Sequence, residues 1–246
     1  PFESVRRVLG GLWGLEITPA ALVGFDKKLA KAGRPAYEQI ADMIRYSTHT
    51  NTDETGWPAE NLTQWLWVFA NTAAVMFKID PSRAGSVLRS VLGEQYCGIL
   101  GSDCFSAYNT IEAKAKQKCL AHYEKAAKDL EKFYPQDQEV LLFASCVRDI
   151  FRRARRVKRY WLAGKLCDEL AGQNAHDFEK ELDRLLQRQL ENGDAENLRK
   201  RLIAHRNENF TFLRYKYVDP DNNRAERALR PSVVMRKITY GNTSRT

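Results

Sequence analysis

Three acidic residues are set apart from the other charged side chains by their places in the chain. Asp53 follows the polar residues 49–52 and is expected to end a strand, and Asp103 is expected to end a later, buried strand. Glu226 lies inside an expected C-terminal helix. Mg²⁺ prefers carboxylate oxygens, and two such ions about 3.5–4 Å apart stabilise the attacking and leaving oxygens of phosphoryl transfer. Taken one at a time, such residues are usually solvated groups or helix caps, so their meaning depends on whether the fold brings them together.

The elements expected around Asp53 and Asp103 form an α/β unit. Residues 62–70 and 74–79 are rich in aromatic and β-branched side chains and are separated by a short polar break, so they predict a β-hairpin. Residues 81–93 predict a helix that ends at its glycine. Because this helix leads to the strand before Asp103, a right-handed crossover would place the ends of the two Asp-bearing strands side by side.

The remaining elements are expected to be helical. Residues 1–46 predict three short helices, with the second starting at Thr18-Pro19 and the third running from Pro35 to Arg45. This is the outline of a helix-turn-helix DNA-reading module, and equally of a small helical bundle that caps the next domain. We expect a core of residues 47–134, an all-α region of residues 135–215 and a C-terminal part of residues 216–246. A last helix is expected to open at Asp219-Pro220 and to close at Pro231.

Motifs around the three acids resemble those of a known family. They are Asp53-Glu54-Thr55-Gly56, Gln64-Trp65-Leu66-Trp67-Val68-Phe69, Ser102-Asp103 with Ala107-Tyr108, and Asp221-Asn222-Asn223-Arg224-Ala225-Glu226-Arg227-Ala228-Leu229-Arg230-Pro231 with Arg236-Lys237. From about Thr18 to its end, the chain resembles the insertion sequence 66 family of bacterial transposases, and the last block is the most specific part. The resemblance implies an RNase H-like mixed sheet flanked by helices and interrupted by an all-α insertion, with an N-terminal helical segment.

The same resemblance implies a function. Asp53, Asp103 and Glu226 would be the catalytic triad of an Asp-Asp-Glu enzyme that holds two Mg²⁺ or Mn²⁺ ions. The implied activity is metal-dependent cleavage of double-stranded DNA at transposon ends, followed by strand transfer into target DNA. The implied setting is the bacterial cytoplasm, at the nucleoid, as a homo-oligomer assembled on DNA. Two alternatives stay open, namely a catalytically incomplete DNA-binding remnant or regulator and an RNase H-like nuclease.

Four further residues are candidates for supporting contacts. Cys119 and His122 form a Cys-x-x-His pair, which is a recurrent feature of related transposases. A zinc site needs about four ligands, so a buried cysteine beside a hydrogen-bonded histidine is favoured over a zinc ion here. His49 is expected to share a strand face with the first carboxylate, and Asn223 to lie near Glu226 on the last helix.

The net charge of the 246-residue chain is +8, and the excess lies in two blocks. Residues 148–159 hold seven basic side chains and one acid, and residues 224–246 hold six basic side chains and one acid. A solvated helix face would carry both signs, so contact with phosphates is the better interpretation. The candidate DNA contacts are Arg152, Arg153, Arg155, Arg156, Lys158, Arg159, Arg227, Arg230, Arg236 and Lys237.

Composition excludes several classes of protein. The 43% of hydrophobic residues is enough for a core and argues against global disorder. No apolar run approaches the roughly 18 residues of a membrane span, so no membrane partner is expected. Five cysteines at irregular spacing indicate a reducing compartment rather than a secreted disulfide framework. The start at Pro1-Phe2-Glu3-Ser4 has no Met and no signal-peptide core, so we expect a processed or excised piece of a longer protein.

Overall fold

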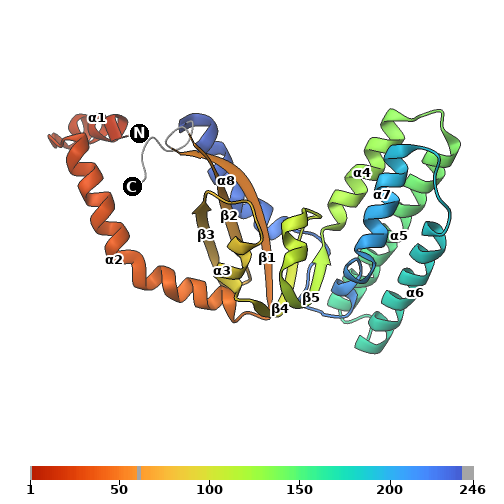
Figure 1. Ribbon diagram of the computed structural model, residues 1–246. Helices are drawn as coiled ribbons and strands as arrows, with labels where there is room; N and C mark the ends of the chain where they lie inside the picture. Colours follow the sequence, from red (N-terminus) through yellow and green to blue (C-terminus); the bar gives the residue numbers. More distant parts are fainter. Residues whose placement is uncertain (1, 60–61, 240–246) are drawn as a thin grey trace.

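A five-stranded mixed sheet flanked by helices forms the centre of the molecule, as Figure 1 shows for the computed structural model of the chain. The structure describes residues 2–59 and 62–239, so Pro1 and residues 240–246 at the end of the second basic block lie outside it. The expected mixed α/β fold is confirmed. The strands stand in the order β3-β2-β1-β4-β5 and are β1 (His49–Ala59), β2 (Leu62–Ala70), β3 (Val75–Asp80), β4 (Gln95–Ser102) and β5 (Glu112–Lys118).

The predicted hairpin and crossover are both present. β2 pairs antiparallel with β1 and β3, whereas β4 runs parallel to β1 and β5 parallel to β4. The helix between β3 and β4 is α3 (Ser86–Leu92), and it ends at Gly93, whose φ of 89° suits a residue without Cβ. The alternating side chains of β2 are apolar on both faces, because helices cover the sheet on two sides.

Strand β1 is longer than the sequence predicts. It pairs with β4 only over residues 49–51 but with β2 from Asn51 to Ala59, so Asp53 lies inside β1 at the point where β4 has ended. The prediction that Asp53 ends the strand is therefore wrong. Beyond Asn51, the antiparallel strand β2 continues to form hydrogen bonds with the backbone of β1, whereas the parallel strand β4 does not.

Both prolines that are predicted to separate or end helices lie inside one. The N-terminal segment has two helices rather than three, α1 (Phe2–Trp13) and the single 27-residue α2 (Pro19–Arg45), which contains Pro35. The last helix, α8 (Asn223–Thr239), begins later than its predicted Asp219-Pro220 start and continues through Pro231. An interior proline costs about 3 kcal/mol because a backbone N–H is lost. In α8 this cost is offset by apolar packing on the sheet before Pro231 and by a contact of Arg236 with β1 after it.

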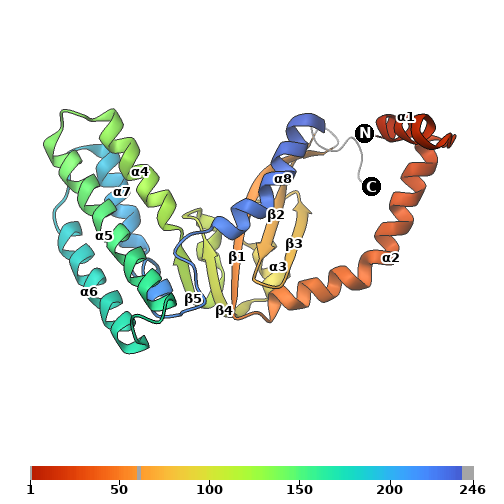
Figure 2. The same cartoon turned by 180° about the vertical axis from the view of Figure 1, so that it is seen from behind.

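Helices cover the two faces of the sheet unequally. One face packs against α3, the end of α2 and the short helix η1 (Ser106–Thr110), around Trp67 and Phe69. On the other face, Ala225 and Leu229 of α8 pack against Trp57, Leu66 and Val68. Seen from behind in Figure 2, α8 crosses β1 and β2, while α1 and α2 extend away from the sheet.

Four helices form a second body beside β5, visible at the right of Figure 1. They are α4 (Leu120–Phe133), α5 (Gln138–Leu162), α6 (Asp168–Leu186) and α7 (Gly193–Ala204). Phe151 and Phe178 both lie 5.9 Å from Phe210, ring centroid to ring centroid, in the core of this bundle. The short helices η2 (Arg206–Glu208) and η3 (Thr211–Leu213) lead from it towards α8. Among the helices of residues 2–59 and 62–239, none is long and apolar enough to cross a bilayer.

Arg155 joins this bundle to the segment that precedes α8. Its guanidinium donates to both carboxylate oxygens of Asp221, at 2.6 and 3.2 Å, and also pairs with Glu124 of α4. The three side chains are 16–23% exposed. Asp221 Oδ1 also accepts the N–H of Ala121 at 2.9 Å, in the first turn of α4. The ion pairs therefore fix the chain ahead of α8 against the start of α4.

We expect Arg155→Met to lower the free energy of unfolding by about 1–3 kcal/mol, between the values for exposed and fully buried ion pairs. The loss arises because two part-buried carboxylates would lose their charge partner. The matched control is Arg156→Met, since Arg156 is an exposed neighbour on α5. Urea denaturation of both variants checks this, and equal losses in the two would contradict it.

Candidate active site

The sheet brings Asp53 and Asp103 to neighbouring positions. Asn51 of β1 stands opposite Gly101 of β4, and each aspartate lies two residues further along its own chain. Because side chains alternate between the faces of a sheet, residues two apart share a face. Asp103 is the first residue after β4, and its Oδ1 accepts the N–H of Phe105 at 2.8 Å. The two carboxylates therefore lie beside one another at the end of β4.

Helix α8 brings the third carboxylate to the same face. Glu226 lies in the first turn of α8, next to Ala225, which packs against Val68 on the face of the sheet that carries Asp53. The charges of Asp103 and Glu226 both act on Asp53. All three acids singled out from the sequence are thus placed on one side of the sheet, although they come from three separate elements.

The surroundings of Asp53 disfavour its negative charge. Burial, together with the charges of Glu54, Asp103 and Glu226, raises the pKa of Asp53 to about 7, although a hydrogen bond from the N–H of Glu54 acts in the opposite direction. A carboxylate with this pKa is not neutralised by a basic side chain. The donor set is hard oxygen in a negative field, which fits a divalent cation such as Mg²⁺.

Asn222 holds the start of α8 on the sheet. Its side chain is 1% exposed, donates from Nδ2 to the carbonyl of Thr52 at 2.8 Å, and accepts from Asn51 Nδ2 at 3.1 Å. Its backbone N–H donates to Cys119 Sγ at 3.2 Å, and its carbonyl accepts the N–H of Glu226 at 3.2 Å. Asn222 therefore sets the position of Glu226. Asn222 is not among the site residues predicted from the sequence, although it stands in the most specific motif.

Glu54 organises the opposite face of the sheet. It accepts hydrogen bonds from the hydroxyl of Tyr108 and from Arg83, whose guanidinium lies 4.0 Å from the ring centroid of Phe105. Burial raises the pKa of Glu54, and burial also raises the pKa of Tyr108 well above its usual value. This network fixes η1 and hence the turn that follows Asp103. In the sequence, the only sign of this network is that Glu54 directly follows Asp53.

Cys119 and His122 lie next to Glu226. Cys119 precedes α4 and His122 is in its first turn, and their ligand atoms lie within 4.8 Å of each other and of a Glu226 oxygen. The separation of His122 Nδ1 and Glu226 Oε1 is 4.0 Å. Burial raises the pKa of the Cys119 thiol to about 12.

The other two supporting candidates differ in burial. His49 is buried on the strand face of Asp53, and burial lowers its pKa to about 4. Its Nε2 makes no hydrogen bond with any described residue. Asn223 is exposed in the first turn of α8, so the asparagine that reaches the interior is its neighbour Asn222.

The arginine-rich part of α5 divides into inward and outward side chains. Lys158 is 3% exposed, its Nζ donates to the carbonyls of Phe212, Tyr215 and Lys216 at 2.6–3.0 Å, and burial lowers its pKa to about 8. Arg155 makes the ion pairs described above. Both side chains thus stabilise the bundle.

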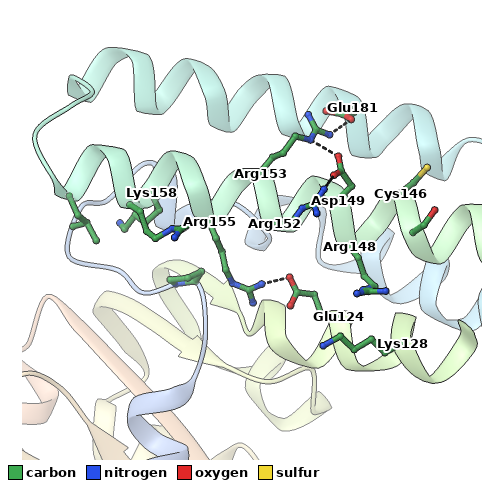
Figure 3. Close-up of a pocket in the computed structure, with 14 residues that line it drawn as sticks. Glu124, Lys128, Cys146, Arg148, Asp149, Arg152, Arg153, Arg155, Lys158 and Glu181 are labelled. Atoms are coloured by element: carbon green, nitrogen blue, oxygen red, sulfur yellow. Dashed lines mark hydrogen bonds and ion pairs between the residues drawn. The ribbon is translucent and has the colours of Figure 1, made fainter. Parts of the chain in front are cut away.

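A hollow of about 860 Å³ lies along α5, with α4 on one side and Glu181 of α6 on the other, and most of its lining residues belong to α5. Figure 3 shows its charged lining, in which Arg153 pairs with Asp149 and Glu181. Arg152 also pairs with Asp149 but is 78% exposed. Arg156 and Arg159 are exposed and form no ion pair with any described residue. Arg156 and Arg159 are therefore free to meet an anion, and Arg152 is exposed to solvent although it pairs with Asp149.

The basic residues of α8 also differ in their contacts. Arg236 donates to Thr55 Oγ1 at 3.0 Å and to the carbonyl of Gly56, so it ties α8 to β1. Arg227, Arg230 and Lys237 are exposed. Of the four candidate DNA contacts in α8, one is therefore bonded to β1 and three are exposed to solvent.

We expect the stability of the metal-free protein to fall as pH rises from about 4 to about 7. In this window the unfolded chain has lost the Asp53 proton while the folded protein, with the pKa raised to about 7, retains it. Asp53→Asn should therefore raise the melting temperature by several degrees at pH 8 and by less at pH 5. Thermal melts in EDTA check this, with Asp219→Asn as the control. An equal effect at both pH values would contradict the expectation.

The whole chain matches one protein family. A model of the transposase IS66 family matches residues 1–246, which include the three carboxylates, the Asp221-Asn222 pair and both basic blocks. Comparison with curated proteins finds no match. The family supports a transposase role, with a nuclease or transferase activity and DNA as the partner. The chain belongs to the transposase IS66 family.

Proposed function

We propose that this chain is the catalytic region of an Asp-Asp-Glu DNA transposase with an RNase H-like core. The proposal rests on Asp53, Asp103 and Glu226 sharing one face of the sheet, where burial and the charges of neighbouring acids raise the pKa of Asp53 to about 7. A surface role would leave these acids apart and solvated. Their convergence favours catalysis over a remnant that only binds DNA.

The carboxylates are proposed to hold two Mg²⁺ or Mn²⁺ ions. Such ions supply positive charge to the attacking and leaving oxygens of a phosphodiester. The protein's own contribution is position, since two aspartates stand on adjacent strands and Asn222 fixes the helix that carries Glu226. Burial of the negatively charged carboxylates would serve the reaction, because it gives them an affinity for a cation that surface carboxylates lack.

The proposed reaction has two steps at the same triad. Water attacks a phosphodiester at the transposon end, and the bond to the 3′ oxygen breaks to leave a 3′-hydroxyl. That hydroxyl then attacks a phosphodiester of the target strand, with a second 3′ oxygen leaving. Both steps are in-line displacements at phosphorus, so one constellation of carboxylates serves both.

Duplex DNA is proposed to reach the triad along the arginine-lined hollow of α5. Pro220 borders this hollow, and the chain passes from it through Asp221 and Asn222 into α8. On the bundle, phosphates would contact Arg152 and Arg159, which line the hollow, and the exposed Arg156 of the same helix. On α8 they would contact Arg227, Arg230 and Lys237. Phosphate contacts set register without reading sequence. Assembly of two or more chains on paired ends is part of the proposal.

We expect Asp53→Asn, Asp103→Asn and Glu226→Gln each to lower Mg²⁺-dependent cleavage of a duplex with the element's terminal sequence by at least about 100-fold. The control is Asp219→Asn, which removes a nearby carboxylate outside the triad. Cleavage is followed on labelled DNA. Retained cleavage in any triad variant would refute the assignment, and cleavage of RNA–DNA hybrids without cleavage of element ends would indicate a nuclease.

We expect Arg152→Ala, Arg156→Ala and Arg159→Ala together to reduce the salt dependence of DNA binding. Each lost phosphate contact lowers the log–log slope by about 0.9, so the triple variant should lose about 3 units. The control triple, Lys180→Ala, Arg184→Ala and Arg188→Ala, removes the same charge from exposed positions in α6 and just after its end. Fluorescence anisotropy at several salt concentrations gives both slopes. Equal reductions would show a general charge effect instead of a defined contact.

A further inference from the structure

Glu226 has two possible sets of partners, and they differ in chemistry. The carboxylates of Asp53 and Asp103 form one set, and the thiol of Cys119 and the imidazole of His122 form the other. Oxygen donors alone suit Mg²⁺, whereas a set with sulfur and nitrogen suits a softer cation. The second set joins a carboxylate of the proposed triad to two side chains that the proposed reaction does not use.

The three atoms lie close to the arrangement of a tetrahedral site. They are within 4.8 Å of one another, and tetrahedral zinc with bonds of about 2.0–2.3 Å needs its ligands about 3.3–3.8 Å apart. The side chains of His122 and Glu226 are 43% and 38% exposed, so both have room to rotate inward. Cys119 is 1% exposed and is the fixed member. Closure therefore needs a shift of about 1 Å by two side chains.

The backbone around this set is already held in place. The N–H of Leu120 donates to the carbonyl of Pro220 at 3.0 Å, and the N–H of Ala121 donates to Asp221 Oδ1 at 2.9 Å. Asn222 donates its N–H to Cys119 Sγ at 3.2 Å. The start of α4 is thus bonded to the segment that directly precedes α8. The bond to Sγ is also the kind of outer contact that supports a metal-bound thiolate.

We propose that Cys119, His122 and Glu226 bind a thiophilic divalent cation of the zinc class, and that this binding withdraws Glu226 from the triad. Three protein ligands leave the fourth position of the ion to water. Binding converts the thiol to a thiolate and releases its proton to solvent. Because rotation of Glu226 towards Cys119 and His122 would take its carboxylate away from Asp53 and Asp103, Zn²⁺ would inhibit the Mg²⁺-dependent reaction. The inhibitory half of this inference depends on the proposed function, whereas the site itself does not.

Co²⁺ is the probe for the site, because a cobalt–thiolate bond gives an intense near-ultraviolet band. Metal-stripped full-length chain should bind one Co²⁺ with this band, and Zn²⁺ should displace it. Loss of an outer contact costs about 10–100-fold in metal affinity, so Cys119→Ser, which loses a direct ligand, should cost at least about 100-fold in Zn²⁺ affinity. His122→Gln, at an exposed position, should also weaken binding. Cys146→Ser, a part-exposed cysteine of α5, is the matched control.

The outcomes separate this inference from the proposed function. Glu226→Gln should weaken Zn²⁺ binding, while Asp53→Asn and Asp103→Asn should leave it within about twofold because neither is a ligand. A cobalt–thiolate band that survives Cys119→Ser, or that His122→Gln leaves unchanged, overturns the site, whatever the Mg²⁺-dependent cleavage does. Cleavage that micromolar Zn²⁺ does not inhibit, in a protein that shows the band, overturns the inhibitory half. A band without any cleavage would instead count against the proposed function and leave the site standing.

Discussion

Asp221 and Asn222 hold together three parts of the molecule that are far apart in the sequence. Asp221 is bonded to Arg155 of α5 and to the first turn of α4, and Asn222 is bonded to β1 and to Cys119. The contacts of Asn222 are buried and those of Asp221 are part-buried, and away from water hydrogen bonds are stronger and unpaired polar groups are costlier. The position of Glu226 follows from this pair, because its backbone is bonded to Asn222.

Unlike these stabilising contacts, the cluster of Asp53, Asp103 and Glu226 lowers the stability of the folded protein. Asp53 is part-buried beside other acids, and its burial and their charges raise its pKa to about 7. A fold optimised only for stability would replace such a residue, since uncompensated buried charge opposes folding. Hydrogen bonds hold this part of β1 on both faces of the sheet, through Asn222 on one face and through Glu54 and Tyr108 on the other. The fold therefore tolerates the unfavourable free energy of the charged Asp53 side chain.

The basic side chains of α5 illustrate how one helix combines structure and binding. Lys158 and Arg155 point into the bundle and satisfy carbonyl and carboxylate groups there. Arg156 and Arg159 remain exposed on the outer surface. Since the inward members hold the helix against the segment before α8, the outward members keep a defined position relative to the carboxylates. Charge density alone would not provide this, because flexible basic segments bind phosphates without fixing them in space.

The sequence by itself determined the sheet's hairpin, the crossover, the helical bundle and the three carboxylates, because apolar periodicity and motif spacing are local properties. Tertiary structure decided where β1 ends and that Pro35 and Pro231 lie within helices, since pairing with β2 and contacts with the sheet outweigh local preference. It also decided which basic residues are internal and that Glu226 stands beside Cys119 and His122. The sequence separates Glu226 from His122 by about 100 residues. Only the packing of two helix starts brings them together, and no local pattern records that contact.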